Sequence, residues 1–281
     1  MSEPAGYGTL PTPCAMRSHS AACLNIMTVA KICMLIFATG AQLYAMTPPN
    51  AKPNPKERLK PTGLERSVTW GPILMKVFAI ANVRVLYTLL IIFQGILCAC
   101  TFAELAFATG HESVIQKPLA SILIRSHSPP DFDPAVLSPA LIVGSFLSIV
   151  GTAIRAHCYR TLGRLFTFEL SIRQGHKLLT SGPYSIVRHP SYAGGLLVFL
   201  GVLLCHFHIR SWLVSSSGLF PSSGQATKWT LAFICAALSS LLYAGLGARI
   251  QKEEKMLEEH FGDQWRSYTK KVPYRLVPWL Y

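Results

Sequence analysis

The stretch "GPYSIVRHPSYAGG", from Gly182 to Gly195, directly precedes an apolar run. Its Pro190 suits the first turn of a helix, where a backbone N–H would have no partner in any case. The Gly-Pro pair at its start favours a turn, and the glycines at its end allow another backbone to approach closely. The stretch therefore predicts a turn and then a helix that enters a membrane. The free N–H groups of that helix start suit a carboxylate or another polar ligand group.

The composition agrees with a membrane protein. Of the 281 residues, 51% are hydrophobic and 14% are charged, against about a quarter charged in ordinary soluble domains. A spanning helix needs about 20 apolar residues. We therefore expect an all-α, polytopic integral membrane protein with about five transmembrane helices. The expected spans are Ala22–Met46, Val85–Ala108, Ala135–Ala156, Ser191–His208 and Trp229–Ala248.

The net charge of +13 is distributed unevenly along the chain. Lysine and arginine are dense in residues 47–84, in residues 155–190 and after residue 248, and sparse in the connections between them. The positive-inside rule places the dense segments in the cytosol, so the quoted stretch and the C-terminal region share one side. Basic loops beside a membrane meet anionic lipid. We expect neither a nucleic-acid partner nor a metal site, because no zinc finger, basic aromatic strand or spaced histidine box is visible.

A second constellation follows the last expected span. The stretch "ARIQKEEKMLEEHFGDQW", residues 248–265, predicts a cytosolic amphipathic helix. Its apolar stripe comprises Ile250, Leu257 and Phe261. At about 100° per residue, Glu253 and Glu254 lie on either side of this stripe, and Arg249 is an i, i+4 neighbour of Glu253. Acids that flank an apolar stripe at the membrane edge favour a lined pocket.

Plainer interpretations stay open for both constellations. Tyrosine, arginine and histidine near a helix start also form interfacial belts at the depth of the lipid headgroups. The acidic helix would equally serve as a solvated charged face. Two further charges, Lys31 and Glu104, fall within expected spans, where charge is expensive; we leave both outside the site.

The two constellations together resemble a known family. The sequence "HKLLTSGPYSIVRHPSYAGG", followed by "RIQKEEKMLEEHFGDQWRSYTKKVPYRLVPW", closely resembles isoprenylcysteine carboxyl methyltransferases, in a fungal-looking form. The resemblance covers about Leu162 to Tyr281. It implies a multi-pass enzyme of the endoplasmic reticulum membrane whose active site faces the cytosol. Such an enzyme transfers a methyl group from S-adenosylmethionine to the C-terminal carboxylate of a prenylated (farnesyl or geranylgeranyl) cysteine, so its partners are prenylated proteins and membrane lipid.

The resemblance also assigns site residues. Cofactor contacts are implied for His176, Lys177, Leu178, Leu179, Tyr184, His189, Pro190, Ser191, Tyr192 and Glu253. The resemblance assigns substrate contact to Arg249, which, with Glu253, we expect to be catalytic, and we add Arg188 to the substrate contacts. Where some family members have a cofactor-contacting glutamine, this chain has Glu169, and we include it with Glu254 among the cofactor residues, since a carboxylate attracts a cationic ligand.

We divide the chain into an N-terminal tail (1–21), N-terminal transmembrane helices (22–156) and a catalytic region (157–281) with two transmembrane helices and the C-terminal helix. Alternatives to the proposed activity are methylation of a phospholipid amine or another lipophilic small molecule, an NADPH-dependent sterol-reductase relative, and a scaffold without activity. "KKVPYRLVPWLY" resembles the ends of sterol reductases. No G-x-G-x-x-G turn is present, so the cofactor would be bound at the helix start.

Overall fold

The computed structural model describes residues 13–51, 53, 57, 92, 95–106, 136–168, 170–215, 219–220 and 224–280. Over these residues the fold is helical and contains no extended strand, which confirms the all-α prediction. The elements are α1 (Pro13–Met46), α4 (Pro139–Leu162), α5 (Pro190–His206), α6 (Trp212–Ser215), α7 (Gly224–Phe261) and α8 (Asp263–Lys271), with 3₁₀ turns η2 (Gly163–Leu165) and η3 (Gly182–Ser185). A further helical segment spans Gly95–Ala106.

The described helices fit a polytopic membrane protein, as predicted. Ile26–Met46, Pro139–Leu165 and Gly224–Phe261 are long and apolar enough to cross a bilayer. Gly95–Ala106 and α5 are shorter apolar helices. Each of these five helices overlaps one expected span, although residues 85–91, 93–94 and 107–108 of the second expected span lie outside the described residues. Helix α4 continues beyond the expected end at Ala156 to Leu162.

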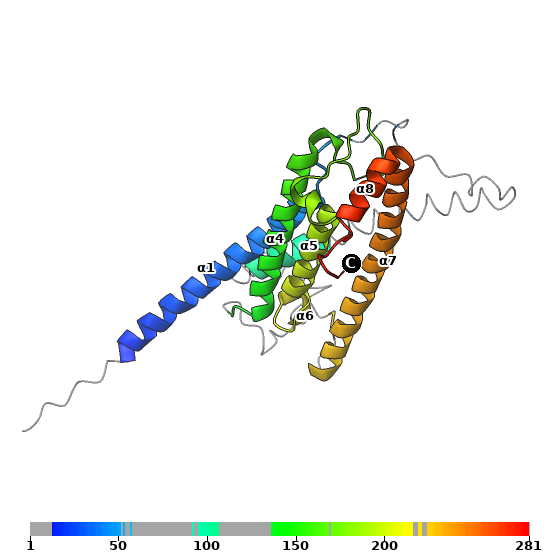
Figure 1. Ribbon diagram of the computed structural model, residues 1–281. Coiled ribbons are helices and arrows are strands. Elements are labelled where there is room, and N and C mark those ends of the chain that lie inside the picture. The colour runs from blue at the N-terminus through cyan, green and yellow to red at the C-terminus, as the bar shows by residue number, and fades with distance from the viewer. Residues whose placement is uncertain are drawn as a thin grey trace, which may run out of the picture.

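Helices α4 and α5 pack closely because small residues meet at their crossing. A Cβ atom at Gly151 would lie 2.4 Å from the carbonyl oxygen of Gly194, and one at Gly144 would lie 2.7 Å from that of Gly201. In lipid, such close backbone approach supplies the van der Waals contact that replaces the hydrophobic effect between helices. Helix α1 packs against both α4 and α5 (Figure 1). The glycines after Pro190 therefore position the start of α5 against α4.

A buried ion pair joins two of the apolar helices. Lys31 Nζ of α1 lies 2.8 Å from Glu104 Oε1 of the segment Gly95–Ala106, and both side chains are almost fully buried. The backbone N–H of Trp212, at the start of α6, donates to Glu104 Oε2 at 3.4 Å. Each charge is thus compensated by its partner. This contact accounts for both charges within the expected spans and lies outside the candidate site described below.

Helix α7 extends well beyond the bilayer. Its 38 residues span roughly 57 Å at 1.5 Å per residue, whereas the hydrocarbon core is about 30 Å thick. The charged part after residue 248 therefore projects from the membrane. Helix α8 follows at Gly262, whose φ of 53° reverses the chain direction. The end of α4, the start of α5, the end of α7 and helix α8 gather at the same end of the molecule (Figure 1).

Candidate active site

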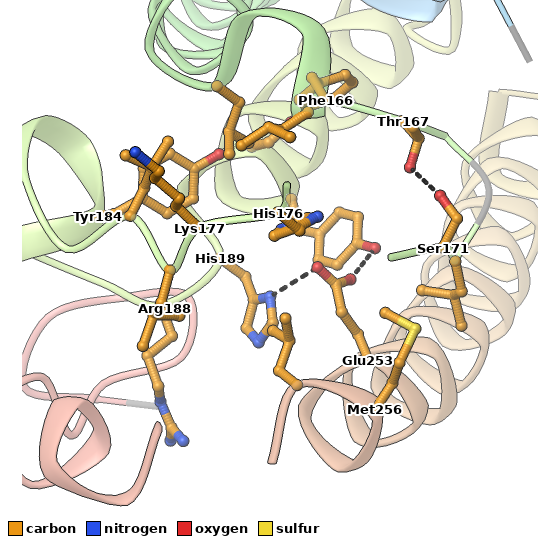
Figure 2. Close-up of a pocket in the computed structure, with 18 of the residues that line it drawn as sticks. Phe166, Thr167, Ser171, His176, Lys177, Tyr184, Arg188, His189, Glu253 and Met256 are labelled. Atoms are coloured by element: carbon orange, nitrogen blue, oxygen red, sulfur yellow. Dashed lines mark hydrogen bonds and ion pairs between the residues drawn. The ribbon is translucent and has the colours of Figure 1, made fainter. Parts of the chain in front are cut away.

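A cavity lies where these four elements meet. Both motifs contribute to its wall, together with the loop after α4 and helix α8. The predicted site residues that line it are His176, Lys177, Leu178, Leu179, Tyr184, Arg188, His189, Ser191, Tyr192, Arg249 and Glu253. Pro190 and Glu254 are not among its lining residues, and Glu169 lies outside the described residues. Figure 2 shows His176, Tyr184, His189 and Glu253 grouped around this space.

The turn before α5 is held by the C-terminal segment. Pro190 begins the helix, as predicted, and His189 occupies the N-cap position. The backbone N–H of Arg188 donates to the carbonyl of Tyr274, and that of His189 donates to the carbonyl of Arg275, both at 2.9 Å. These two N–H groups lie before the first residue of α5, and carbonyl groups of the C-terminal segment accept their hydrogen bonds. The site is therefore assembled from three segments that are distant in sequence.

Tyr192 links the two charged residues that we predict to be catalytic. Arg249 Nε donates to the phenol oxygen of Tyr192 at 2.6 Å, and the phenol donates to Glu253 Oε2 at 2.5 Å. A guanidinium N–H of Arg249 also donates to the carbonyl of Phe168. Arg249 and Glu253 are thus placed one helical turn apart on α7 with the phenol of α5 between them. This arrangement presents a fixed cation and a fixed carboxylate to one cavity.

The neighbouring Glu254 has a different environment. Its carboxylate accepts from His189 Nε2 at 3.2 Å and forms ion pairs at 2.9 Å with Arg188 and with Arg275. Burial favours a raised pKa for Glu254, but the hydrogen bond from His189 and the charge of Arg188 outweigh it and hold the pKa below its ordinary value. The two adjacent glutamates therefore face different partners: Glu253 faces the cavity, and Glu254 faces the C-terminal segment.

The cavity wall includes buried polar atoms for which the described part of the chain provides no hydrogen-bond partner. His176 Nδ1 and Ser191 Oγ are such atoms. Burial lowers the pKa of His176, and the nearby His260 lowers it further, against the opposing effect of Glu253. His176 is therefore neutral at pH 7. Because buried polar atoms are normally satisfied, both atoms are suited to bonding a polar ligand.

The sequence interpretation missed Arg155. Its position just inside the end of the third expected span placed it in the basic cytosolic segment. In the structure it is buried on α4 and lines the cavity. Its Nε donates to the carbonyl of Ala45 at 2.9 Å, and its Nη1 donates to the carbonyl of Ser191 at 3.0 Å. An arginine at the margin of an apolar run was the available signal, because such residues tend to face a bundle interior.

Aromatic and apolar residues complete the wall. Met256 and Leu257 of α7 and Trp265 of α8 line the cavity beside the predicted residues. Trp265 is buried with Tyr268, and Leu257 packs against this cluster. The hydroxyl of Tyr268 donates to the carbonyl of Tyr184 at 2.7 Å, which ties α8 to the turn before α5. The predicted amphipathic stripe of α7 thus has a specific partner, helix α8.

Comparisons with known proteins give one family match and several relatives. Residues 143–220 match the model of the isoprenylcysteine carboxyl methyltransferase (ICMT) family. The chain is 32% identical over 134 residues to protein-S-isoprenylcysteine O-methyltransferase B of Arabidopsis thaliana, covering 46% of this chain and 55% of that protein. It is 31% identical over 126 residues to protein-S-isoprenylcysteine O-methyltransferase of Schizosaccharomyces pombe, covering 44% of each.

A third similarity is to a different class of enzyme. The chain is 29% identical over 112 residues to a Delta(14)-sterol reductase of Methylotuvimicrobium alcaliphilum, covering 40% of this chain but 21% of that protein. The matches to the two methyltransferases span about half of each relative's length. The residues matched by the family model include the motif around Pro190. Through its residues 143–220, the chain is thus similar to the isoprenylcysteine carboxyl methyltransferase family.

Proposed function

We propose that this protein transfers a methyl group from S-adenosylmethionine to the C-terminal carboxylate of a prenylated cysteine. The observation that carries the proposal is the joint presentation of Arg249 and Glu253 to one cavity, through the phenol of Tyr192. The match of residues 143–220 to the isoprenylcysteine carboxyl methyltransferase family model supports it. We further propose that the site faces the cytosol and that the membrane is the endoplasmic reticulum.

The lining residues fit the proposed cofactor. S-adenosylmethionine supplies an electrophilic methyl group on a positively charged sulfur. Glu253 provides the carboxylate that attracts such a cation. His176 Nδ1 and Ser191 Oγ are unsatisfied polar atoms for its polar groups, and the aromatic rings of Phe166 and Trp265 in the cavity wall suit a purine.

Arg249 is the residue that we assign to the acceptor. A guanidinium forms strong, charge-assisted hydrogen bonds with a carboxylate. The bonds to Tyr192 and to the carbonyl of Phe168 fix its orientation. A C-terminal carboxylate has a pKa of about 3.5, so it is ionised at neutral pH and the protein needs no general base. The remaining task is alignment of two reactants, which contributes roughly 7–11 kcal/mol when the geometry is right.

The membrane supplies the rest of the substrate. A prenyl chain partitions into lipid, and its burial between apolar side chains needs no aqueous route. Leu162, Leu165 and Met256 give the cavity wall an apolar part beside the polar one. Arg188, which we expect to contact substrate, lines the cavity with a side chain that also pairs with Glu254. The proposed donor and acceptor thus approach one site from the cytosol and from the bilayer.

The test is methyl transfer from radiolabelled S-adenosylmethionine to N-acetyl-farnesylcysteine by the purified protein in nanodiscs. A carboxyl methyl ester releases its label in alkali, whereas an N-methyl group does not. We expect Arg249→Ala and Glu253→Gln to lose most activity while they still insert into the membrane. The matched control is Glu258→Gln, since Glu258 is exposed on the same helix. Full activity in either site variant would remove that residue from the site.

The same preparation tests the alternatives. Phosphatidylethanolamine replaces the prenylcysteine to test an amine acceptor, and alkali-stable label in lipid would favour that activity. A sterol with a Δ14 double bond and NADPH tests the reductase alternative, for which the similarity to a Delta(14)-sterol reductase is the reason. Oxidation of NADPH without methyl transfer would replace the proposal.

A further inference from the structure

We infer that Glu254 is a positioning residue: it clamps Arg188 and His189 to the C-terminal segment, and through His189 it fixes Tyr192 between Arg249 and Glu253. The inference rests on the proposed methyl transfer for its kinetic test. It differs from the sequence expectation, in which Glu254 contacts the cofactor. The contacts of Glu254 and their continuation into the cavity support it.

The carboxylate of Glu254 is fully engaged by protein groups. Oxygen Oε1 accepts from Arg188 Nη1 at 2.9 Å and from His189 Nε2 at 3.2 Å. Oxygen Oε2 accepts from Arg275 Nη2 at 2.9 Å and from its Nε at 3.1 Å. A carboxylate has about four acceptor positions, so these four bonds use its capacity. Only 12% of the Glu254 side chain is exposed, so little of its surface is accessible to a ligand.

These bonds join three separate parts of the chain. Arg188 and His189 belong to the turn before α5, Arg275 belongs to the C-terminal segment, and Glu254 belongs to α7. The backbone of the turn is bonded to the same C-terminal segment, through the carbonyls of Tyr274 and Arg275. A guanidinium N–H of Arg188 also donates to the carbonyl of Pro273 at 2.9 Å. Glu254 therefore fastens the turn and the segment to α7 as one unit.

The two arginines make the carboxylate indispensable to this unit. Both guanidinium groups lie within 3 Å of the same side chain. Without its negative charge, two cations would face each other in a partly buried space, where a lost partner costs much more than it does at an exposed surface. Glutamine in place of Glu254 would keep the size of the side chain but release this clamp.

His189 carries the effect into the cavity. Its ring stacks on that of Tyr192, with centroids 5.6 Å apart and planes 16° apart. Its Nδ1 lies 3.9 Å from Glu253 Oε1 (Figure 2). A shift of the imidazole therefore moves the phenol that bonds both Arg249 and Glu253. Glu254, which does not line the cavity, is thus connected through His189 and Tyr192 to Arg249 and Glu253, which do.

Kinetics of the full-length protein in nanodiscs test the inference. The variants are Glu254→Gln, Glu254→Asp, Tyr192→Phe and the double variant Glu254→Gln/Tyr192→Phe, with Glu258→Gln as the matched control. Because a displacement of about 1 Å costs about 100-fold in rate, we expect Glu254→Gln to lower kcat by about 10- to 100-fold. Glu254→Asp, which keeps the charge, should recover part of this loss. Glu258→Gln should stay within about twofold of the wild type, as expected for an exposed residue with weak ion pairs.

The double variant separates positioning from general stabilisation. If Glu254 acts through Tyr192, the losses of the two single variants do not multiply, because residues in one network are not additive. Multiplying losses would overturn the inference. An unchanged kcat with a raised KM for S-adenosylmethionine would also overturn it and would make Glu254 a direct ligand. A Glu254→Gln variant with the kcat and KM of the wild type would overturn the inference as well.

A readout without substrates keeps the inference separate from the proposed function. If the wild type transfers no methyl group to prenylcysteine, the proposed function fails. The inference is then decided by hydrogen–deuterium exchange of the backbone amides of residues 188, 189 and 191–193. Faster exchange in Glu254→Gln than in Glu258→Gln supports the clamp, and equal exchange in the two variants overturns it.

Discussion

The phenol of Tyr192 donates a 2.5 Å hydrogen bond to the carboxylate of Glu253, a residue 61 positions later in the chain. This bond joins the start of α5 to the C-terminal part of α7. The same phenol accepts from Arg249, so one side chain orders both charges of the candidate site. The two motifs are therefore parts of a single structure, as their order and shared membrane side predict.

The geometry of Arg249 predicts that lysine cannot replace it. Lysine keeps the positive charge but lacks the planar fork that bonds Tyr192 and the carbonyl of Phe168 at the same time. We expect Arg249→Lys to lower kcat/KM for the prenylcysteine by about 100-fold, with a smaller change in the affinity for S-adenosylmethionine. Steady-state kinetics and calorimetry measure the two effects. Arg266→Lys, at an exposed position, is the control, and equal activity of both variants would contradict the assignment.

The close crossing of α4 and α5 predicts a sensitive glycine. A methyl group at Gly151 would meet the backbone of Gly194 at 2.4 Å, so Gly151→Ala must push the helices apart. Overpacking of this kind costs about 1–3 kcal/mol. We expect a lower thermal midpoint in detergent and reduced activity, because Gly194 lies close to the site. Gly40→Ala has nothing within 4 Å and should leave the midpoint unchanged.

The ion pair between Lys31 and Glu104 predicts a rescue by exchange. Removing one partner of a buried pair leaves an uncompensated charge and costs about 3–5 kcal/mol. Lys31→Glu should therefore lower the thermal midpoint strongly, and so should Glu104→Lys. The double variant restores opposite charges and should recover much of the loss. An exchange variant no more stable than either single variant would show that the pair is not the stabilising unit.

Acid should destabilise the end of the molecule that holds the candidate site in two steps. The folded pKa of His176 is lowered, so its contribution to stability is lost as the pH falls through the unfolded value of about 6.5. The folded pKa of Glu254 is also lowered, so its contribution is present above about 4.5 and lost below it. Thermal midpoints measured from pH 8 to pH 3 test both steps. His176→Gln should reduce the first step and leave the second unchanged.

Much of the fold was predictable because long apolar runs and loop charge carry strong signals. The helix start at Pro190 was predictable as well, since proline restricts its own position. The separation of Glu253 from Glu254 follows from helical periodicity alone, and the structure places them with different partners. Periodicity identifies faces of a helix, but it does not identify what covers them. The C-terminal segment that occupies Glu254 was therefore not foreseen.

Arg155 shows the complementary limit. Its sequence position next to other basic residues indicates a cytosolic cation, and the end of a span is uncertain by a few residues. Six further residues of helix beyond Ala156 and the partners on Ala45 and Ser191 change its environment to the interior of the bundle. These partners are distant in sequence, so only the packed structure reveals them.

The hydrogen bonds from the turn before α5 to Tyr274 and Arg275 also determine when the site can form during biosynthesis. The helices that bear His189 and Glu253 emerge from the ribosome before the strap formed by residues 273–275. Until that strap has emerged, Glu254 lacks Arg275, and the backbone N–H groups of Arg188 and His189 lack their acceptors. Formation of the site therefore requires residues 273–275 as well as the helices, and it is not complete before these residues have emerged.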